Sequence, residues 1–241
     1  KIQEKLGADI IFAFDECTSP LHNYEYTKKS MERTHRWAKR SLESYDKKQK
    51  LYGIIQGGAY KDLRIESAKY INSLNFDGMA IGGALGDTKN SKNKIIKYIV
   101  KKLASETPRH LLGIGDVDDI FEAVENGIDS FDCVWFTRLA RREMYFIYPE
   151  SGGNIKKRWR KNIRSGGTLS INEPLDKNCN CKICQKYSKT YIRHLVVSNE
   201  ITGMKLLTYH NVYYVNNLFE KIREAIKNDS FIKLKKSWYG V

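Results

Sequence analysis

The first two-thirds of the chain repeats one pattern, in which a short apolar run ends in a polar or glycine-rich turn and an amphipathic helical stretch follows. Short apolar runs that alternate with helices are typical of buried parallel strands in βαβ units. We expect five such strands, over residues 10–14, 52–55, 79–81, 110–114 and 130–136. Helices are expected between them, over residues 24–48, 61–74, 92–105 and 117–125.

Two architectures are built from such units, an open doubly wound sheet and a (β/α)₈ barrel. The five strand ends supply Asp, Gln, Gly-Gly, Gly-Asp and Asp-Cys in turn. A barrel draws the residues of its site from many strands at once, so this distribution favours the barrel. Since a closed barrel has eight strands, we expect an α/β chain that holds about five C-terminal strands of a TIM barrel and lacks the N-terminal ones.

The composition bounds the class of protein. The chain has 241 residues, 41% of them hydrophobic, with 42 Lys and Arg against 28 Asp and Glu, a formal net charge of +14. This excess favours a polyanionic partner such as nucleic acid, and a generally lysine-rich surface explains it equally well. No run approaches the ~18 apolar residues of a membrane span, and no signal peptide opens the sequence. We therefore expect a cytoplasmic protein without a membrane partner.

Five cysteines cannot form a closed disulfide framework, and a reducing compartment with a metal site suits them better. Three of them crowd into six positions: Cys179, Cys181 and Cys184. Zinc takes four tetrahedral ligands, so one more is needed, and His194 and His210 are the candidates. A helix over residues 182–199 would carry His194 about 15 Å away along its axis, whereas a glycine-containing break at residues 202–203 lets His210 fold back. We therefore predict one structural zinc ion per chain, held by the three cysteines and His210.

The sequence changes character near Pro149, where a loop-rich stretch and a basic cluster around Trp159 begin. Two amphipathic segments, over residues 182–199 and 211–227, follow the cysteines. We divide the chain into a partial barrel (1–148), a basic, zinc-binding insertion (149–210) and a final barrel helix with a basic tail (211–241).

The expected strand ends carry the candidates for chemistry. Asp15 and Asp132 are each open to three roles: nucleophile, base recogniser or buried structural acid. Cys133 is expected to be structural, because His110 opens its strand and so lies at the wrong end to serve as its base.

Glutamine and glycine at two further strand ends suit a planar ligand. The amide of Gln56 can both donate to and accept from a heterocycle. Gly82-Gly83 lets backbone amides approach a flat ligand closely. An ordinary polar loop and a tight turn explain these residues equally well.

Several motifs then occur in order along the chain: FDECT at 14–18, GIIQGG at 53–58, IGG at 81–83, GIDSFDCV at 127–134 and TRLAR at 137–141. With the three cysteines and His210, they make the chain closely resemble the tRNA-guanine transglycosylases over nearly its whole length. The FDCV stretch and the metal motif are the specific parts of this resemblance.

The resemblance implies a (β/α)₈ barrel with a zinc-binding insertion before its final helix, and a homodimer. Members of that family exchange guanine at the wobble position of tRNAs with a GUN anticodon (the Asp, Asn, His and Tyr tRNAs) for a 7-deazaguanine, on the route to queuosine. Asp132 resembles the nucleophile that attacks the anomeric carbon of the ribose and holds the tRNA covalently. A carboxylate can trap such an oxocarbenium-like centre, as in retaining glycosidases.

The resemblance also implies roles in recognition. The heterocycle would be bound by Asp15, Gln56 and the Gly82-Gly83 backbone, with Cys17 beside them. Arg138 and Arg141 would contact the anticodon loop. The basic cluster around Trp159 and the basic tail would bind phosphates.

The chain departs from the family pattern at three places. The second aspartate of the family, in a Ser-Gly-Gly-Phe-Gln context, has no counterpart here, so we expect the general acid/base to be missing. Residues 84–87 read ALGD where the bacterial pattern has Leu-Ala-Val-Gly-Glu, which leaves the aminomethyl precursor and queuine both open as the incoming base. Phe136 stands where the family usually has proline.

Two other functions compete with a transglycosylase. A non-catalytic tRNA-binding subunit would keep the fold and the zinc, and the presence of both Asp15 and Asp132 argues against it. An archaeal-type transglycosylase that acts elsewhere in tRNA is disfavoured, since no further RNA-binding domain follows the last helix.

Overall fold

The computed structural model describes residues 2–83, 85–86, 88–165 and 173–241. The chain forms two compact units. The sheet unit comprises Lys1–Gly115 and Asp119–Cys133, and the helical unit comprises Asp116–Asp118 and Val134–Val241. None of the described helices is both long enough and apolar enough to cross a membrane.

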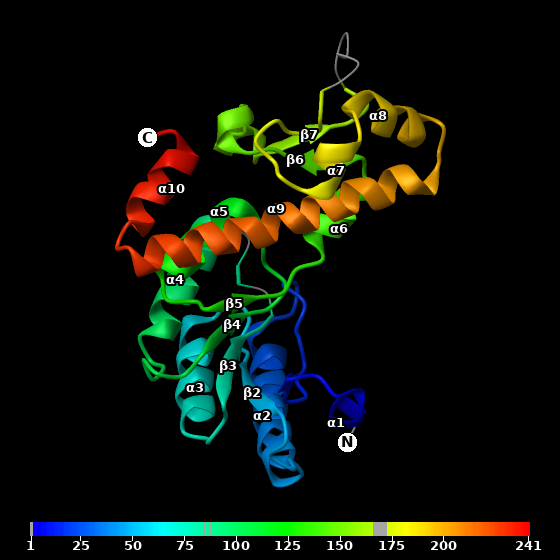
Figure 1. Cartoon of the computed structure of the whole chain (residues 1–241). Helices are drawn as coiled ribbons and strands as arrows, with labels where there is room; N and C mark the ends of the chain where they lie inside the picture. The colour runs from blue at the N-terminus through cyan, green and yellow to red at the C-terminus, as the bar shows by residue number, and fades with distance from the viewer. Residues whose placement is uncertain (1, 84, 87, 166–172) are drawn as a thin grey trace. The chain divides into compact units, whose positions relative to one another are not determined.

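The sheet unit is a five-stranded parallel sheet with the strand order β1-β2-β3-β4-β5 (Figure 1). The strands are β1 (Ile10–Phe12), β2 (Lys50–Ile55), β3 (Gly78–Ile81), β4 (Arg109–Leu111) and β5 (Ser130–Phe131). A short α1 (Ile2–Leu6) precedes them, and the connecting helices are α2 (Tyr24–Glu43), α3 (Lys61–Asn72), α4 (Lys89–Val100) and α5 (Val117–Glu125). The predicted alternation of strands and helices is therefore confirmed.

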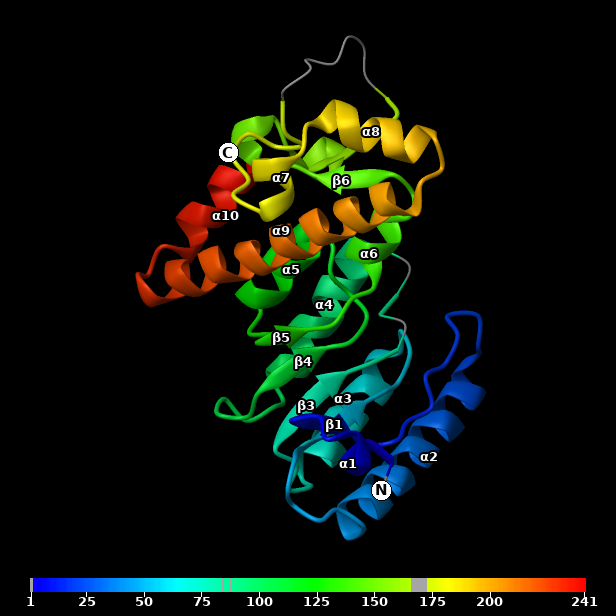
Figure 2. The ribbon, with the colours of Figure 1, turned by 45° about the vertical axis from the view of Figure 1, so that its right-hand side comes forward.

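The connecting helices lie against one face of the sheet (Figure 2), and a hydrophobic core cluster fills the space between them. Side chains alternate between the two faces along a strand, and the core-facing set is Ile11, Leu51, Ile55, Met79, Ile81 and Leu111. Helix residues such as Ala38, Ile71 and Ile96 belong to the same cluster. This packing leaves the other face of the sheet to carry Phe12, Tyr52 and His110.

The sheet is curled, as in the wall of a barrel. The rings of Phe12 on β1 and His110 on β4 have their centroids 5.2 Å apart, although two strands separate β1 from β4 in the sheet order. Small residues make this approach possible, because Ala80 pairs with His110 and Gly78 pairs with Tyr52. A Cβ on Gly78 would lie 2.3 Å from the Tyr52 ring, so that ring covers the glycine. The sheet is thus a curled half-barrel.

The helical unit contains an antiparallel pair, β6 (Met144–Phe146) and β7 (Arg160–Asn162). Its helices are α6 (Trp135–Ala140), α7 (Lys182–Lys186), α8 (Lys189–Val197), α9 (Ile201–Lys227) and α10 (Phe231–Tyr239), with 3₁₀ turns η1 (Pro149–Ser151) and η2 (Ile155–Lys157). Aromatic rings fill its interior, among them Tyr148, Trp159, Tyr214 and Trp238.

The long helix α9 corrects the expected break at residues 202–203. It begins at Ile201 and runs through both residues, so the predicted boundary between residues 210 and 211 falls inside a helix. Gly203 is a packing glycine, since a Cβ there would lie 2.8 Å from the Val196 side chain on α8. Glycine here permits close helix contact and does not end a helix.

Other expected elements are shorter than predicted, and two of these differences bear on the site. The segment 182–199 is two helices, because Tyr187 adopts an extended conformation (φ −127°, ψ 136°). Ser188 then caps α8 by accepting the backbone N–H of Tyr191 at 3.2 Å. The fifth strand ends at Phe131, and residues 135–136, which were expected to belong to it, start α6.

Candidate active site and metal centre

The sheet unit places the predicted reaction residues at one edge. Asp15 lies just beyond β1, Gln56 follows β2, Gly82-Gly83 follow β3, and Asp132 follows β5. Because the strands are parallel, their carboxyl ends meet at the same edge, where α/β proteins build their sites. The fold therefore brings residues of four strands to one edge. The ALGD motif at 84–87 includes positions 84 and 87, which lie outside the described residues.

Gln56 and Asp15 are joined by a hydrogen bond in which Gln56 Nε2 donates to Asp15 Oδ2 at 2.6 Å. Gln56 is 1% exposed, and its Oε1 is buried without a donor among the described residues. A Cβ on Gly83 would lie 2.3 Å from that oxygen, so glycine is required beside it. The site thus holds a buried, unpaired acceptor next to a carboxylate, and an N–H group of a ligand could satisfy it.

Burial changes the pKa values of the Asp15 carboxyl and the Cys17 thiol beside this glycine turn. Partial burial raises the pKa of Asp15, and the hydrogen bond from Gln56 opposes the rise. Burial and the charge of Asp15 raise the pKa of the Cys17 thiol, whose sulfur accepts the backbone N–H of Gly83. Cys17 is therefore held as a neutral thiol, and a reactive cysteine would need to be a thiolate.

A buried polar chain holds the backbone of Gln56. Its N–H donates to Ser67 Oγ at 3.1 Å, and Ser67 Oγ lies 3.0 Å from His35 Nε2. Burial lowers the pKa of His35 to about 4, so its ring is neutral at pH 7. The Ser67 hydroxyl can then donate to His35 while it accepts from Gln56. The ring also stacks on Tyr70, with centroids 4.3 Å apart.

Arg64 on α3 ties together the turns that follow β2 and β3. Its guanidinium is fully buried and donates to the carbonyl oxygens of Ile55 (3.0 Å), Gly58 (2.6 Å) and Gly82 (2.7 Å). Burial lowers the pKa of Arg64 to about 10, so the group stays charged at neutral pH. Arg64, Ser67 and His35 were missed from the sequence, because a polar residue on a helix facing a sheet leaves no signal in the apolar pattern.

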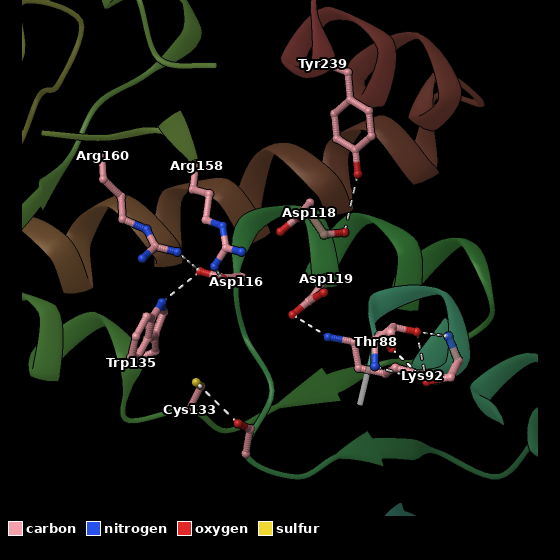
Figure 3. Close-up of polar contacts among 12 residues, drawn as sticks. Thr88, Lys92, Asp116, Asp118, Asp119, Cys133, Trp135, Arg158, Arg160 and Tyr239 are labelled. Carbon is pink, nitrogen blue, oxygen red and sulfur yellow. Dashed lines mark hydrogen bonds and ion pairs between the residues drawn. The ribbon is translucent and has the colours of Figure 1, made fainter. Parts of the chain in front are cut away.

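Asp132 is the exposed carboxylate of the edge, with 58% of its side chain accessible. His110 Nε2 lies 3.1 Å from its Oδ1, and the backbone N–H of Gly113 donates to the same oxygen at 3.3 Å. The expectation that His110 lies at the wrong end of its strand is therefore wrong. β4 is only three residues long, so the ring spans the distance to the strand end. Cys133 follows the strand and its sulfur lies 3.7 Å from Gly113 O (Figure 3).

A second site lies in the helical unit, where three sulfurs and an imidazole converge. The ligand atoms of the four residues lie within 4.8 Å of one another. His210 Nδ1 is 3.6, 3.5 and 3.4 Å from the sulfurs of Cys179, Cys181 and Cys184, in that order. The cluster could hold a metal ion, whereas His194 lies exposed on α8.

Hydrogen bonds with the backbone orient two of these ligands, His210 and Cys181. His210 Nε2 donates to Phe146 O at 2.8 Å, which leaves the Nδ1 lone pair to face the sulfurs. The Cys181 sulfur accepts the backbone N–H of Cys184 at 3.3 Å at the start of α7. Hydrogen bonds from the Cys179 and Cys184 thiols lower the pKa of Cys181, so the cluster already favours a thiolate there.

Arg138 on α6 and Arg141 at its C-cap are both exposed. The Asp116 carboxylate anchors this helix, since it accepts the indole N–H of Trp135 at 2.8 Å and pairs with Arg160 (Figure 3). Arg160 also lies 5.2 Å from the Trp135 ring centroid.

The basic cluster around Trp159 is partly neutralised. Trp159 itself is buried, Arg160 pairs with Asp116, and Arg164 donates to Glu143 at 2.6 Å. Exposed basic side chains remain on and beside η2, at Lys156 and Lys157, and at Arg158, which lies 3.4 Å from Asp116.

The family model for queuine tRNA-ribosyltransferase matches residues 1–240. The chain belongs to this family. It is 47% identical over 240 residues to a putative queuine tRNA-ribosyltransferase of Archaeoglobus fulgidus, covering 100% of this chain and 60% of the relative. Queuine tRNA-ribosyltransferases of Natranaerobius thermophilus (40% identity, 99% of this chain, 63% of the relative) and Vibrio cholerae (42%, 100% and 62%) are also similar. The chain thus spans about three-fifths of the length of these family members.

The buried His35 ring predicts an acid-sensitive fold. Its folded-state pKa of about 4 lies below the ordinary 6.5, so the unfolded chain binds the proton more tightly and stability falls as the pH drops through this window. By proton linkage, His35 should contribute a loss of about 2 kcal/mol between about pH 7 and pH 5. Urea unfolding at both pH values should show a smaller acid loss in His35→Gln than in the wild type. Equal losses in the two proteins would contradict this account.

Proposed function

We propose that this protein is a tRNA-guanine transglycosylase, which exchanges guanine at the wobble position of GUN-anticodon tRNAs for a 7-deazaguanine in queuosine formation. The observation that carries the proposal is the arrangement of Asp15, Gln56 and Asp132 at one edge of a sheet that belongs to the queuine tRNA-ribosyltransferase family. Such an edge offers groups that could recognise a base and a separate carboxylate.

The proposed base-binding pocket, formed by Asp15, Gln56 and the Gly82-Gly83 turn, suits the donor and acceptor edge of a guanine-like ring. Ionised Asp15 and the unpaired Gln56 Oε1 would accept N–H groups of the base. The Gly82-Gly83 turn would let its backbone approach the ring, with the neutral Cys17 thiol beside it. The base must leave the anticodon stack to reach such a pocket.

Asp132 would perform the covalent step. One carboxylate oxygen bonds to ribose C1′ as the bond from C1′ to the base nitrogen breaks. The base leaves with the bonding electron pair and takes a proton from water. The incoming deazaguanine then gives up a proton to water and attacks C1′, which releases the carboxylate. Exposure of Asp132 leaves room for a ribose.

The fold fits the C-terminal part of a (β/α)₈ barrel, with β1 to β5 as barrel strands 4 to 8 within residues 1–148. On this proposal residues 149–210 are the basic, zinc-binding insertion, and residues 211–241 are the final barrel helix and basic tail. The curled sheet supports it.

Arg138, Arg141 and the exposed basic residues on and beside η2 would bind the anticodon arm of the Asp, Asn, His and Tyr tRNAs. Phosphate contacts of this kind weaken as the salt concentration rises. We also propose that the protein acts as a homodimer in the cytoplasm, where its tRNA substrate is found.

A structural zinc ion suits the cysteine cluster. With Zn–S near ~2.3 Å and Zn–N near ~2.0–2.1 Å, a tetrahedral ion separates sulfur from nitrogen by about 3.6 Å. The three observed separations, 3.4 to 3.6 Å, agree with this. Four protein ligands close the coordination shell, which is typical of a structural site. The ion would join the cysteine loop to α9.

The nucleophile can be tested by trapping. Denaturing gel electrophoresis should show a protein–tRNA adduct with the wild type and none with Asp132→Asn, whose guanine exchange should fall about a thousandfold or more. Asp129→Asn is the matched control, since Asp129 accepts the backbone N–H of Arg109 at 2.8 Å and lies outside the proposed pocket. An adduct in Asp132→Asn would remove Asp132 from this role. No adduct in any variant would favour a non-catalytic tRNA-binding subunit.

Base binding should weaken in acid. Protonation of Asp15 removes an acceptor, and its raised pKa places this loss above the ordinary value of 3.8. Equilibrium dialysis with radiolabelled guanine between about pH 7 and pH 4 should therefore show a midpoint above that value. Asp15→Asn should bind weakly with no dependence on pH in this range. A flat profile for the wild type would contradict the role of Asp15.

The metal proposal predicts one zinc ion per chain by elemental analysis. Cys181→Ser should lose the ion and unfold the helical unit at lower urea concentration, because structural zinc contributes directly to folding. Cys133→Ser, a cysteine outside the cluster, should retain the metal. A folded wild-type protein without metal would overturn the proposal.

A further inference from the structure

His110 is fixed on the inner face of the sheet between two side chains of the neighbouring strand end. It pairs with Ser130 in the register of β4 and β5. Its Nδ1 lies 2.9 Å from Ser130 Oγ, and its Nε2 lies 3.1 Å from Asp132 Oδ1. The ring is 9% exposed and packs against Phe12 at 5.2 Å. Packing and two hydrogen bonds therefore set its orientation.

The partners of His110 define the roles of its two nitrogens. An ionised carboxylate can only accept, so Nε2 carries the proton and donates to Asp132. Nδ1 then accepts from the Ser130 hydroxyl. Asp132 thus selects the tautomer, because the Ser130 hydroxyl can donate or accept and adapts to it.

The two oxygens of Asp132 differ in their surroundings. Oδ1 receives both the His110 N–H and the Gly113 backbone N–H, at 3.1 and 3.3 Å. Oδ2 has no hydrogen-bond partner among the described residues, and 58% of the side chain is accessible. One oxygen is tied to the protein, and the other is available to a ligand.

We infer that His110 is a positioning residue that makes Oδ2 the attacking oxygen and stabilises the carboxylate as a leaving group. This rests on the proposed transglycosylase function. When Oδ2 bonds to C1′, Oδ1 becomes the carbonyl oxygen of a neutral ester. When the incoming base displaces the ester, the electron pair returns to the carboxylate, and Oδ1 regains charge. Since hydrogen bonds to charged oxygens are stronger than those to neutral ones, His110 favours release of the adduct.

Single-turnover kinetics of the intact protein separate this role from a loss of structure. His110→Phe should resolve the covalent tRNA adduct about tenfold more slowly than the wild type and accumulate more of it, with tRNA affinity unchanged. His110→Gln, whose amide can still donate to Asp132, should recover most of the rate. Mere disruption of the fold would lower the adduct yield instead. An unchanged rate of resolution in His110→Phe, with a normal wild-type adduct, overturns the inference.

The tautomer gives a readout that does not depend on activity. ¹⁵N shifts of His110 should show a proton on Nε2 in the wild type and a mixture of tautomers in Asp132→Ala, which lacks the acceptor. A proton on Nδ1 in the wild type overturns the inference. Absence of any wild-type adduct, with the predicted tautomer present, would instead sink the proposed function and leave His110 only as a partner of Asp132.

Discussion

The buried guanidinium of Arg64 holds together the part of the sheet edge on which the candidate site depends. A buried charge is costly unless the protein replaces its hydration, and here three carbonyl oxygens do so, from two turns that are far apart in the sequence. The same contacts fix the turn after Gln56 and the turn at Gly82-Gly83. Without a donor at this point, both turns would expose unpaired carbonyls to the interior. This part of the edge therefore depends on helix α3 as much as on the strands.

The helical unit depends in a similar way on the backbone of one residue, Phe146. Its carbonyl accepts from His210 at 2.8 Å and its N–H donates to Asn211 Oδ1 at 3.1 Å. The Asn211 amide also donates to Phe136 O on α6 at 3.1 Å. Two adjacent residues of α9 thus link the cysteine cluster, the strand β6 and the helix that carries Arg138. Loss of the cluster would affect the arginine-bearing helix through these contacts.

The five strands in their order and the four residues of the cysteine cluster could be predicted from the sequence, because each leaves a local signal: an apolar run with a polar end, or closely spaced thiols. The sequence prediction is wrong where contacts between distant segments determine the role of a residue. Gly203 looks like a helix end and is a contact glycine, since only the neighbouring Val196 reveals its role. The position of His110 at the start of a strand indicates that it lies far from the site. The strand is in fact too short to separate its ring from Asp132. Arg64 was missed because a polar residue on a helix that faces the sheet leaves no signal in the apolar pattern.

The two carboxylates of the sheet edge, Asp15 and Asp132, have different surroundings, and these surroundings suit different chemical roles. Asp15 is partly buried against an amide whose own oxygen is unpaired among the described residues, so it suits the recognition of a flat, polar ligand in the proposed function. Asp132 is exposed, with both of its protein donors on one oxygen. A nucleophile needs an accessible lone pair, and a recogniser needs a fixed, dry geometry; neither residue could replace the other. Two acids in unlike surroundings can serve separately in binding and in chemistry. Here the fold separates them by placing Asp15 after the first strand and Asp132 after the fifth.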